Sequence, residues 1–215
     1  MSRTPNILWI CPDQQRFDTI HACGNPYIRT PNLDTLTERG VTFTRAYAQN
    51  PLCQPSRASF LTGRYPRTVG VRQNGQEHFP SHERLVTREL THLGYHCGLV
   101  GKLHLAAANG RIEPRPDDGY SVFKWNHDPY YNEAWIEGDD YQKWLQKKGY
   151  DWNEIYHRQS APAYPGVTAE LHQTTWCAEE AMAFMEQTDS PWLLSLNIFD
   201  PHHPYDPPPE FLERY

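Results

Sequence analysis

A cysteine stands directly before a predicted helix, and an arginine follows it one helical turn later. The two residues are Cys53 and Arg57, in the stretch CQPSRASFLTGR at residues 53–64. A proline at position 55 is typical of a first helical turn, where unpaired N–H groups and a partial positive charge attract anions. Arg57 adds a guanidinium on the same side of that helix. The pattern predicts a nucleophile for a tetrahedral anion such as sulfate or phosphate; the alternative is a buried structural cysteine beside a salt-bridged arginine.

Four further polar residues follow predicted buried strands: Asp13, Lys102, His104 and His202. Because parallel strands end at the same edge of a sheet, we expect these side chains to lie close together. The carboxylate of Asp13 is a hard oxygen ligand of the kind that Ca²⁺ prefers. Lys102 and His104 project to the same side of an extended segment, and two such cations suit an oxyanion. Each residue alone has a plainer alternative, such as a helix cap, an exposed lysine or a hydrogen-bonded structural histidine.

Taken together, these strings resemble the defining elements of type I sulfatases, which are Cys-x-Pro-Ser-Arg followed by Leu-Thr-Gly-Arg, then Gly-Lys-x-His and Pro-His-x-Pro. In that family the cysteine is oxidised after translation to formylglycine, whose hydrate is the nucleophile. The resemblance implies an alkaline phosphatase-like α/β/α sandwich, hydrolysis of a small-molecule sulfate ester, and modification of Cys53 by a formylglycine-generating enzyme. It also implies that Asp13 and Cys53 bind a divalent metal, with Ca²⁺ preferred over Mn²⁺ or Mg²⁺.

The same resemblance implies catalytic roles for the other residues. Arg57 and Lys102 would neutralise the sulfate oxygens, His104 would assist release of sulfate, and His202 would protonate the leaving oxygen. One departure is Gln14, which stands where many members carry a second aspartate; the Asp-Gln pair resembles the choline sulfatase and phosphonate monoester hydrolase branches. Two alternatives therefore stay open, a phosphonate or phosphate monoester hydrolase and a non-catalytic binder of sulfated ligands.

Apolar runs alternate with segments of helical pattern, which predicts an α/β fold with a largely parallel sheet. From about residue 113 to 166 the alternation gives way to aromatic residues and prolines, which predicts an insertion lying over the sheet. The 215 residues are predicted to be the N-terminal part of a sulfatase catalytic domain, without the C-terminal part that supplies a second pair of metal ligands and a further lysine in that family. The predicted strands are 6–11, 41–48, 96–101 and 192–199, and the predicted helices are 32–39, 55–63, 84–93, 139–148 and 168–187.

Composition and charge argue against three classes of protein: those that bind nucleic acid, those that span a membrane and those held by disulfides. A net charge of −6, with no basic run longer than Lys147-Lys148, argues against a nucleic-acid partner. No stretch has the pattern of a membrane helix or a signal peptide, and five scattered cysteines argue against a disulfide framework. These features predict a cytoplasmic protein without a membrane partner and leave its oligomeric state open. The remaining histidines, including His127 and His203, are predicted to be structural, solvated or at the substrate rim.

Overall fold

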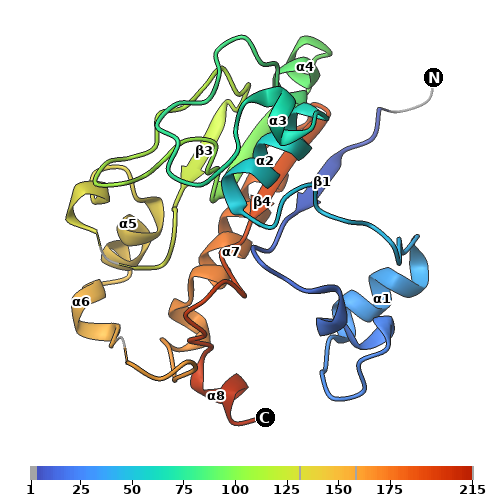
Figure 1. Ribbon diagram of the computed structural model, residues 1–215. Coiled ribbons are helices and arrows are strands. Elements are labelled where there is room, and N and C mark those ends of the chain that lie inside the picture. Colours follow the sequence, from blue (N-terminus) through green and yellow to red (C-terminus); the bar gives the residue numbers. More distant parts are fainter. Residues whose placement is uncertain (1–3, 131, 158, 215) are drawn as a thin grey trace.

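Four parallel strands form a sheet in the computed structural model, which describes residues 4–130, 132–157 and 159–214 (Figure 1). The order across the sheet is β1 (Ile7–Ile10), β4 (Trp192–Asn197), β2 (His96–Gly101) and β3 (Val122–Trp125). The register aligns Ile7 with Leu193, Trp192 with His96 and Gly98 with Val122. Since every pair is parallel, all four carboxyl ends lie at one edge, and the predicted α/β fold with a parallel sheet is confirmed.

Helices cover both faces of the central strands. They are α2 (Cys53–Thr62), α3 (Pro66–Val69), α4 (Val86–His92) and α7 (Gln173–Glu186). Leu99 of β2 packs in a core with residues of α2, α3 and α4, whereas its neighbour Val100 faces the opposite core with residues of α7. Because both faces are covered, β2 and β4 are apolar along nearly their whole length. These layers make the α/β/α sandwich that the sequence predicts.

Further helices connect these elements. They are α1 (Pro31–Arg39), α5 (Asp140–Lys147), α6 (Trp152–Ile155) and α8 (Pro209–Leu212), with 3-10 turns at Phe17–Thr19, His21–Cys23, Glu133–Trp135 and Ala169–Leu171. The predicted helix at 168–187 is divided at His172, whose side chain caps the first turn of α7 by accepting from the N–H of Thr174. Within the described residues, no helix combines the length and the apolar character needed to cross a bilayer.

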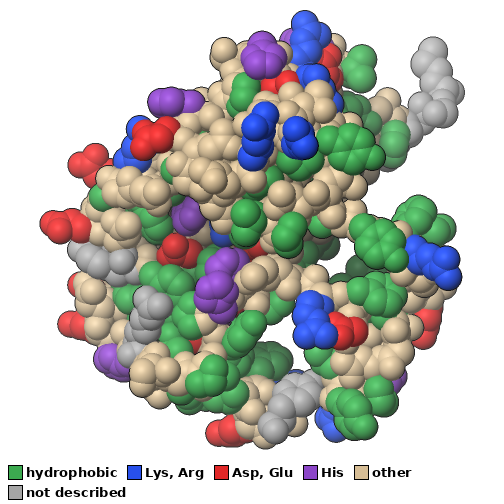
Figure 2. Space-filling view, viewed as in Figure 1, with side chains coloured by type: hydrophobic (Ala, Val, Ile, Leu, Met, Phe, Trp, Pro, Cys, Tyr) green, Lys and Arg blue, Asp and Glu red, His purple; other side chains and the backbone are tan. Residues whose placement is uncertain are grey.

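The predicted strand at 41–48 is wrong. This segment has no regular structure and is exposed along its length, with Val41 81%, Phe43 75% and Tyr47 78% exposed. A strand propensity of this kind reflects fit to a half-buried surface, and no described strand pairs with the segment to provide one. Hydrophobic side chains instead gather on the surface over α1 and the loop that leads to it (Figure 2).

The aromatic-rich stretch at about 113–166 contains a strand that the sequence pattern did not reveal. β3 pairs with β2 at the edge of the sheet, so this stretch extends the sheet as well as lying over it. Its sequence, VFKW, is four residues long and its first three side chains are half-buried, so neither an apolar run nor a clear alternation marks it. The predicted helix in this stretch is confirmed as α5, which Asp139 caps by accepting from the N–H of Gln142.

Gly101 ends β2 and turns the chain into the site. Its φ of 98° is in the left-handed region, and an added Cβ would lie 2.1 Å from the carbonyl oxygen of Asn197. Gly101→Ala is therefore expected to lower the free energy of unfolding by on the order of 3 kcal/mol, because it combines backbone strain with a clash. Gly110→Ala is the matched control in urea unfolding, since Gly110 has a φ of 64° but no atom within 4 Å of an added Cβ. Equal losses in the two variants would contradict the role of the Asn197 contact.

Candidate active site

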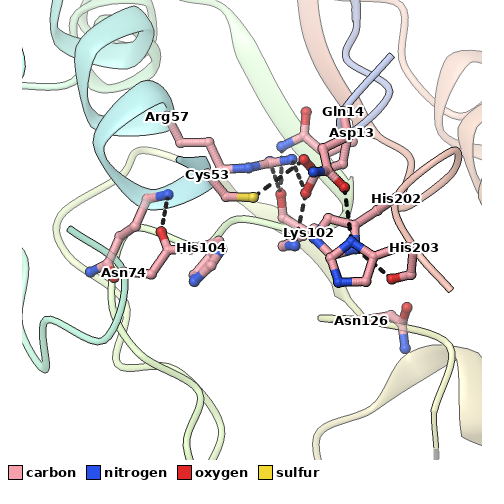
Figure 3. A network of polar contacts seen from close by, with 12 residues as sticks. Asp13, Gln14, Cys53, Arg57, Asn74, Lys102, His104, Asn126, His202 and His203 are labelled. Atoms are coloured by element: carbon pink, nitrogen blue, oxygen red, sulfur yellow. Dashed lines mark hydrogen bonds and ion pairs between the residues drawn. The ribbon is translucent and has the colours of Figure 1, made fainter. Parts of the chain in front are cut away.

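Polar side chains follow each of the four strands where the sheet ends (Figure 3). Asp13 lies beyond β1, Lys102 directly follows β2, Asn126 directly follows β3, and His202 lies beyond β4. Backbone hydrogen bonds between neighbouring strands continue as far as these residues. The N–H of Asp13 donates to Ile198 O at 2.9 Å, and the N–H of Lys102 donates to Asn197 O at 3.0 Å. The parallel strands therefore place polar side chains from four separate segments at one edge of the sheet, as the sequence predicts for three of them.

A buried cluster of one carboxylate and two cations lies at the centre of this edge. Lys102 Nζ is 2.8 Å and Arg57 Nη2 is 3.4 Å from Asp13 Oδ2, and all three side chains are at most 7% exposed. Arg57 Nη1 also donates to the carbonyl oxygen of Lys102 at 2.6 Å. Burial by itself would raise the pKa of Asp13, but Lys102 and Arg57 together lower it to about 2. The cluster thus holds one more positive than negative charge, which is the surplus that a bound anion needs.

Cys53 is the first residue of α2 and faces this cluster. Its Sγ lies 3.4 Å from Asp13 Oδ1, as a thiol donating to the carboxylate. Leu52 has no side chain that caps the helix; Asn74 from a distant loop takes that role, with Oδ1 accepting from the N–H of Gln54 at 2.9 Å. Burial raises the pKa of the Cys53 thiol, and Asp13 raises it further, against Lys102 and Arg57. An unmodified Cys53 therefore stays protonated at neutral pH and is a poor nucleophile.

His104 differs from the sequence prediction in conformation and in charge. Its φ is 52°, so the chain is not extended at this residue. The prediction that Lys102 and His104 project to the same side assumed an extended segment. Burial lowers its pKa to about 2, and Lys102 and Arg57 add to this effect. His104 is therefore neutral, and the cations beside Asp13 are Arg57 and Lys102, which the sequence also predicts. A neutral imidazole does not neutralise the charge of a bound anion.

His202 has a fixed orientation. Its Nδ1 lies 2.7 Å from the carbonyl oxygen of His203, to which it donates, so the lone pair of the neutral ring is on Nε2. The ring packs against Phe199 with centroids 4.7 Å apart and against His203 at 4.5 Å. Burial lowers the pKa of His202, and Lys102 lowers it further, against the hydrogen bond to His203. Gln14 contacts His203, with Oε1 3.3 Å from Nδ1.

Asp13, Cys53 and His202 could share a metal ion, because one ligand atom from each lies within 4.8 Å of the others. This set contains the two metal ligands predicted from the sequence and adds His202. Ca²⁺ prefers six to eight oxygen ligands. The three residues offer one oxygen, one sulfur and one nitrogen, and Lys102 and Arg57 already neutralise the carboxylate. The described residues therefore do not by themselves fit Ca²⁺.

Two cavities open at the site. One of about 220 Å³ is lined by Cys53, Asp13, Arg57 and Gln14, among others. The other, of about 440 Å³, has His202 on its wall together with mainly apolar groups, such as Pro201, Tyr205, Pro208 and Phe211. His202 thus lines the apolar cavity, and one of its ligand atoms lies within 4.8 Å of those of Asp13 and Cys53, which line the polar one.

Two residues near His104, the buried Glu113 and the half-buried His127, were not predicted to belong to the site. The ring of His127 lies 4.5 Å from that of His104, and Glu113 accepts a hydrogen bond from the backbone N–H of His104 at 2.8 Å. Both residues belong to the aromatic-rich stretch. The signal that could have located His127 is its position two residues after β3, and that short strand is what the sequence pattern did not reveal.

Acid is expected to destabilise the protein through Asp13. Its folded pKa of about 2 is below the ordinary value of 3.8. The stability that ionised Asp13 contributes, about 2 kcal/mol, is therefore fully present above pH 4 and is lost as the pH falls towards 2. Urea unfolding between pH 5 and 2 measures this loss, and Asp13→Asn is the control that should have a flatter pH dependence. Equal slopes for the two proteins would show that Asp13 is not the group responsible.

Comparison with known proteins finds relatives along nearly the whole chain. The family model described as Sulfatase matches residues 5–215. The chain is 34% identical over 223 residues to the Arylsulfatase of Clostridium perfringens, covering 98% of this chain and 46% of that protein. It is 30% identical over 214 residues to the Ulvan-active sulfatase of Formosa agariphila, covering 96% and 37% respectively.

Among solved structures, the phosphonate monoester hydrolase of Agrobacterium radiobacter is similar, with a TM-score of 0.77 and 25% identity over 98% of this chain and 44% of that one. The chain therefore spans less than half the length of each of these relatives.

Proposed function

This chain belongs to the sulfatase family, and from that premise we propose that the whole protein hydrolyses a sulfate monoester to an alcohol and inorganic sulfate. The observation that supports this most directly is the position of Cys53. It stands at the first residue of α2, beside a buried cluster with a surplus of one positive charge. A helix N-terminus and two cations stabilise the oxygens of a tetrahedral anion during displacement.

The chemistry follows from modification of Cys53. Conversion to formylglycine supplies a hydrated aldehyde with two hydroxyls on one carbon, of which one attacks sulfur and the other later loses a proton so that sulfate is released. Arg57 and Lys102 neutralise the sulfate oxygens during both steps. His104 is proposed to accept the proton in the second step, as the resemblance to the family implies.

His202 is proposed to assist the alcohol to leave. Because its Nδ1 donates to His203 O, only Nε2 is free to carry a proton to the leaving oxygen, and it must first take that proton up. The apolar cavity on the wall of which His202 lies has room for the alcohol portion of the ester. The name of the Clostridium perfringens relative is consistent with such an apolar alcohol.

A divalent metal is proposed to bind at Asp13 and Cys53, as is general in the family, and we propose Ca²⁺. Since the described residues provide one carboxylate, the other oxygen ligands must come from residues of the whole protein that lie outside this set. Calcium titration of the 215-residue chain should therefore give weak binding, and calcium titration of the whole protein tight binding. Tight binding by the 215 residues alone would contradict this assignment.

A phosphonate or phosphate monoester is the second candidate substrate. The Asp13-Gln14 pair and the similarity to the Agrobacterium radiobacter enzyme support it. The test is to co-express the whole protein with a formylglycine-generating enzyme and compare an aryl sulfate with an aryl phosphonate. Preference for the sulfate supports the proposal, preference for the phosphonate supports the second candidate, and an unmodified Cys53 by mass spectrometry with no turnover supports a non-catalytic binder.

A cytoplasmic location stays a prediction that cell fractionation would test.

A further inference from the structure

The backbone of His104 is held in an unfavourable conformation by a buried carboxylate. A φ of 52° is uncommon for a residue other than glycine and persists only where the surroundings fix it. Glu113 fixes it here: Oε2 accepts from the N–H of His104 at 2.8 Å, and Oε1 accepts from the N–H of Leu105 at 3.0 Å. The indole N–H of Trp125 donates to the same carboxylate at 3.2 Å, which ties Glu113 to the end of β3.

The ring of His104 is held by a second residue of the same stretch. His127 packs edge to face against it, with centroids 4.5 Å apart and an interplanar angle of 81°. Two tryptophans hold His127 in turn: its ring centroid lies 5.3 Å from that of Trp135 and 6.2 Å from that of Trp125. Trp135 is itself anchored, because its indole N–H donates to Ala108 O at 2.8 Å.

Hydrogen bonds do not orient either imidazole through Nδ1. In both His104 and His127, Nδ1 is buried and has no hydrogen-bond partner among the described residues. With no hydrogen bond at Nδ1, the edge-to-face contact with His127 is the contact that restrains the His104 ring on this side. A proton acceptor works only when it is held within hydrogen-bond reach of the proton that it takes.

We propose that Glu113 and His127 are positioning residues for His104, with Glu113 fixing its backbone and His127 fixing its ring. The importance of His104 itself rests on the proposed function, but the two contacts do not. The aromatic-rich stretch thereby gains a definite role, because it delivers both residues, with Trp125 and Trp135 behind them, to the carboxyl edge of the sheet.

Acylation with diethyl pyrocarbonate tests the ring contact without any turnover. The whole protein is treated briefly, and modification of His104 is compared with that of His202 by peptide mass spectrometry. His127→Ala is expected to raise the His104 rate roughly tenfold relative to His202, because the ring is freed. His127→Phe keeps an aromatic ring in place and should leave the ratio close to that of the unchanged protein.

His96→Ala is the matched control for this experiment. His96 also packs against an aromatic ring, at 5.3 Å from Phe184, but at the opposite end of β2. This variant should lower the melting temperature without changing the His104 to His202 ratio. A His127→Ala protein that melts earlier yet keeps the unchanged ratio would overturn the positioning role of His127.

Kinetics on the converted protein test the backbone contact. Glu113→Gln keeps the shape but turns an N–H₂ group towards N–H donors, so kcat for an aryl sulfate should fall by about 10- to 100-fold while KM is retained. Glu83→Gln is the control, because Glu83 is another buried carboxylate and its partner, Arg64 at 2.6 Å, lies outside the site. If Glu113→Gln lowers only the melting temperature, as Glu83→Gln should, Glu113 is structural and the proposal is wrong.

If Cys53 is unmodified and no variant has activity, the proposed function fails, while the acylation result still decides the role of His127.

Discussion

Replacing Cys53 with alanine is expected to lower kcat for a sulfate ester by on the order of 10⁴- to 10⁶-fold, the size of effect seen when a covalent nucleophile is removed. Alanine provides no sulfur to oxidise, and the charged cluster alone can only bind the anion. The side chain is half-buried and makes one weak contact, the 3.4 Å approach to Asp13, so the fold should be retained. Initial rates, together with a thermal unfolding curve for each protein, measure the effect.

Two further cysteine variants sharpen this experiment. Cys53→Ser retains a hydroxyl but not two on one carbon, so at most one turnover per molecule is expected before the enzyme stops. Cys23→Ala removes a thiol from the 3-10 turn at His21–Cys23, which contributes no residue to the site described above, and should keep full activity. Multiple turnovers by Cys53→Ala would exclude a covalent route through position 53.

The strand ends of this site could be located from the sequence, for a simple reason. Asp13, Lys102 and His202 each follow an apolar run, and a strand buried on both faces leaves a long apolar signal. Cys53 and Arg57 lie at a helix start, which the proline at 55 marks. In these places the local sequence determines the local structure, and the parallel topology then brings the side chains together.

The support for His104 could not be predicted in the same way. Its left-handed backbone depends on Glu113, nine residues later, and its ring contact depends on β3, a strand whose first three residues are half-buried and show no period. The error at 41–48 has the opposite cause, because that alternating pattern pairs with no strand in the described residues and stays exposed. Both failures arise where tertiary contacts, and not the local pattern, decide the conformation.

The charge of the central cluster connects stability to function. Asp13 compensates one of two buried cations, and the other remains as a surplus while no anion is bound. A buried charge without a partner is costly, whereas a buried pair costs little more than an apolar replacement. The site therefore gives up stability in order to hold a positive charge where the sulfate oxygens will lie. Removal of Asp13 and removal of Lys102 should accordingly have different effects on the free energy of unfolding.

Lys102→Met is accordingly expected to reduce activity strongly while sparing the fold. It leaves Asp13 with Arg57 at 3.4 Å as a neutral pair, and the methionine can keep the contact that Lys102 makes with the Phe199 ring. The free energy of unfolding should change by less than about 1 kcal/mol, or rise, whereas Asp13→Ala, which leaves two buried cations, should lose about 3–5 kcal/mol. For an aryl sulfate, kcat/KM of Lys102→Met should fall by on the order of 10²- to 10³-fold, as when one oxyanion contact is removed.

Urea unfolding in the presence of a chelator, with and without sulfate, separates the two variants, since added sulfate should stabilise the unchanged protein more than Lys102→Met. If Lys102→Met were as unstable as Asp13→Ala, Lys102 would be a structural partner of Asp13 and the surplus charge would not be held for an anion.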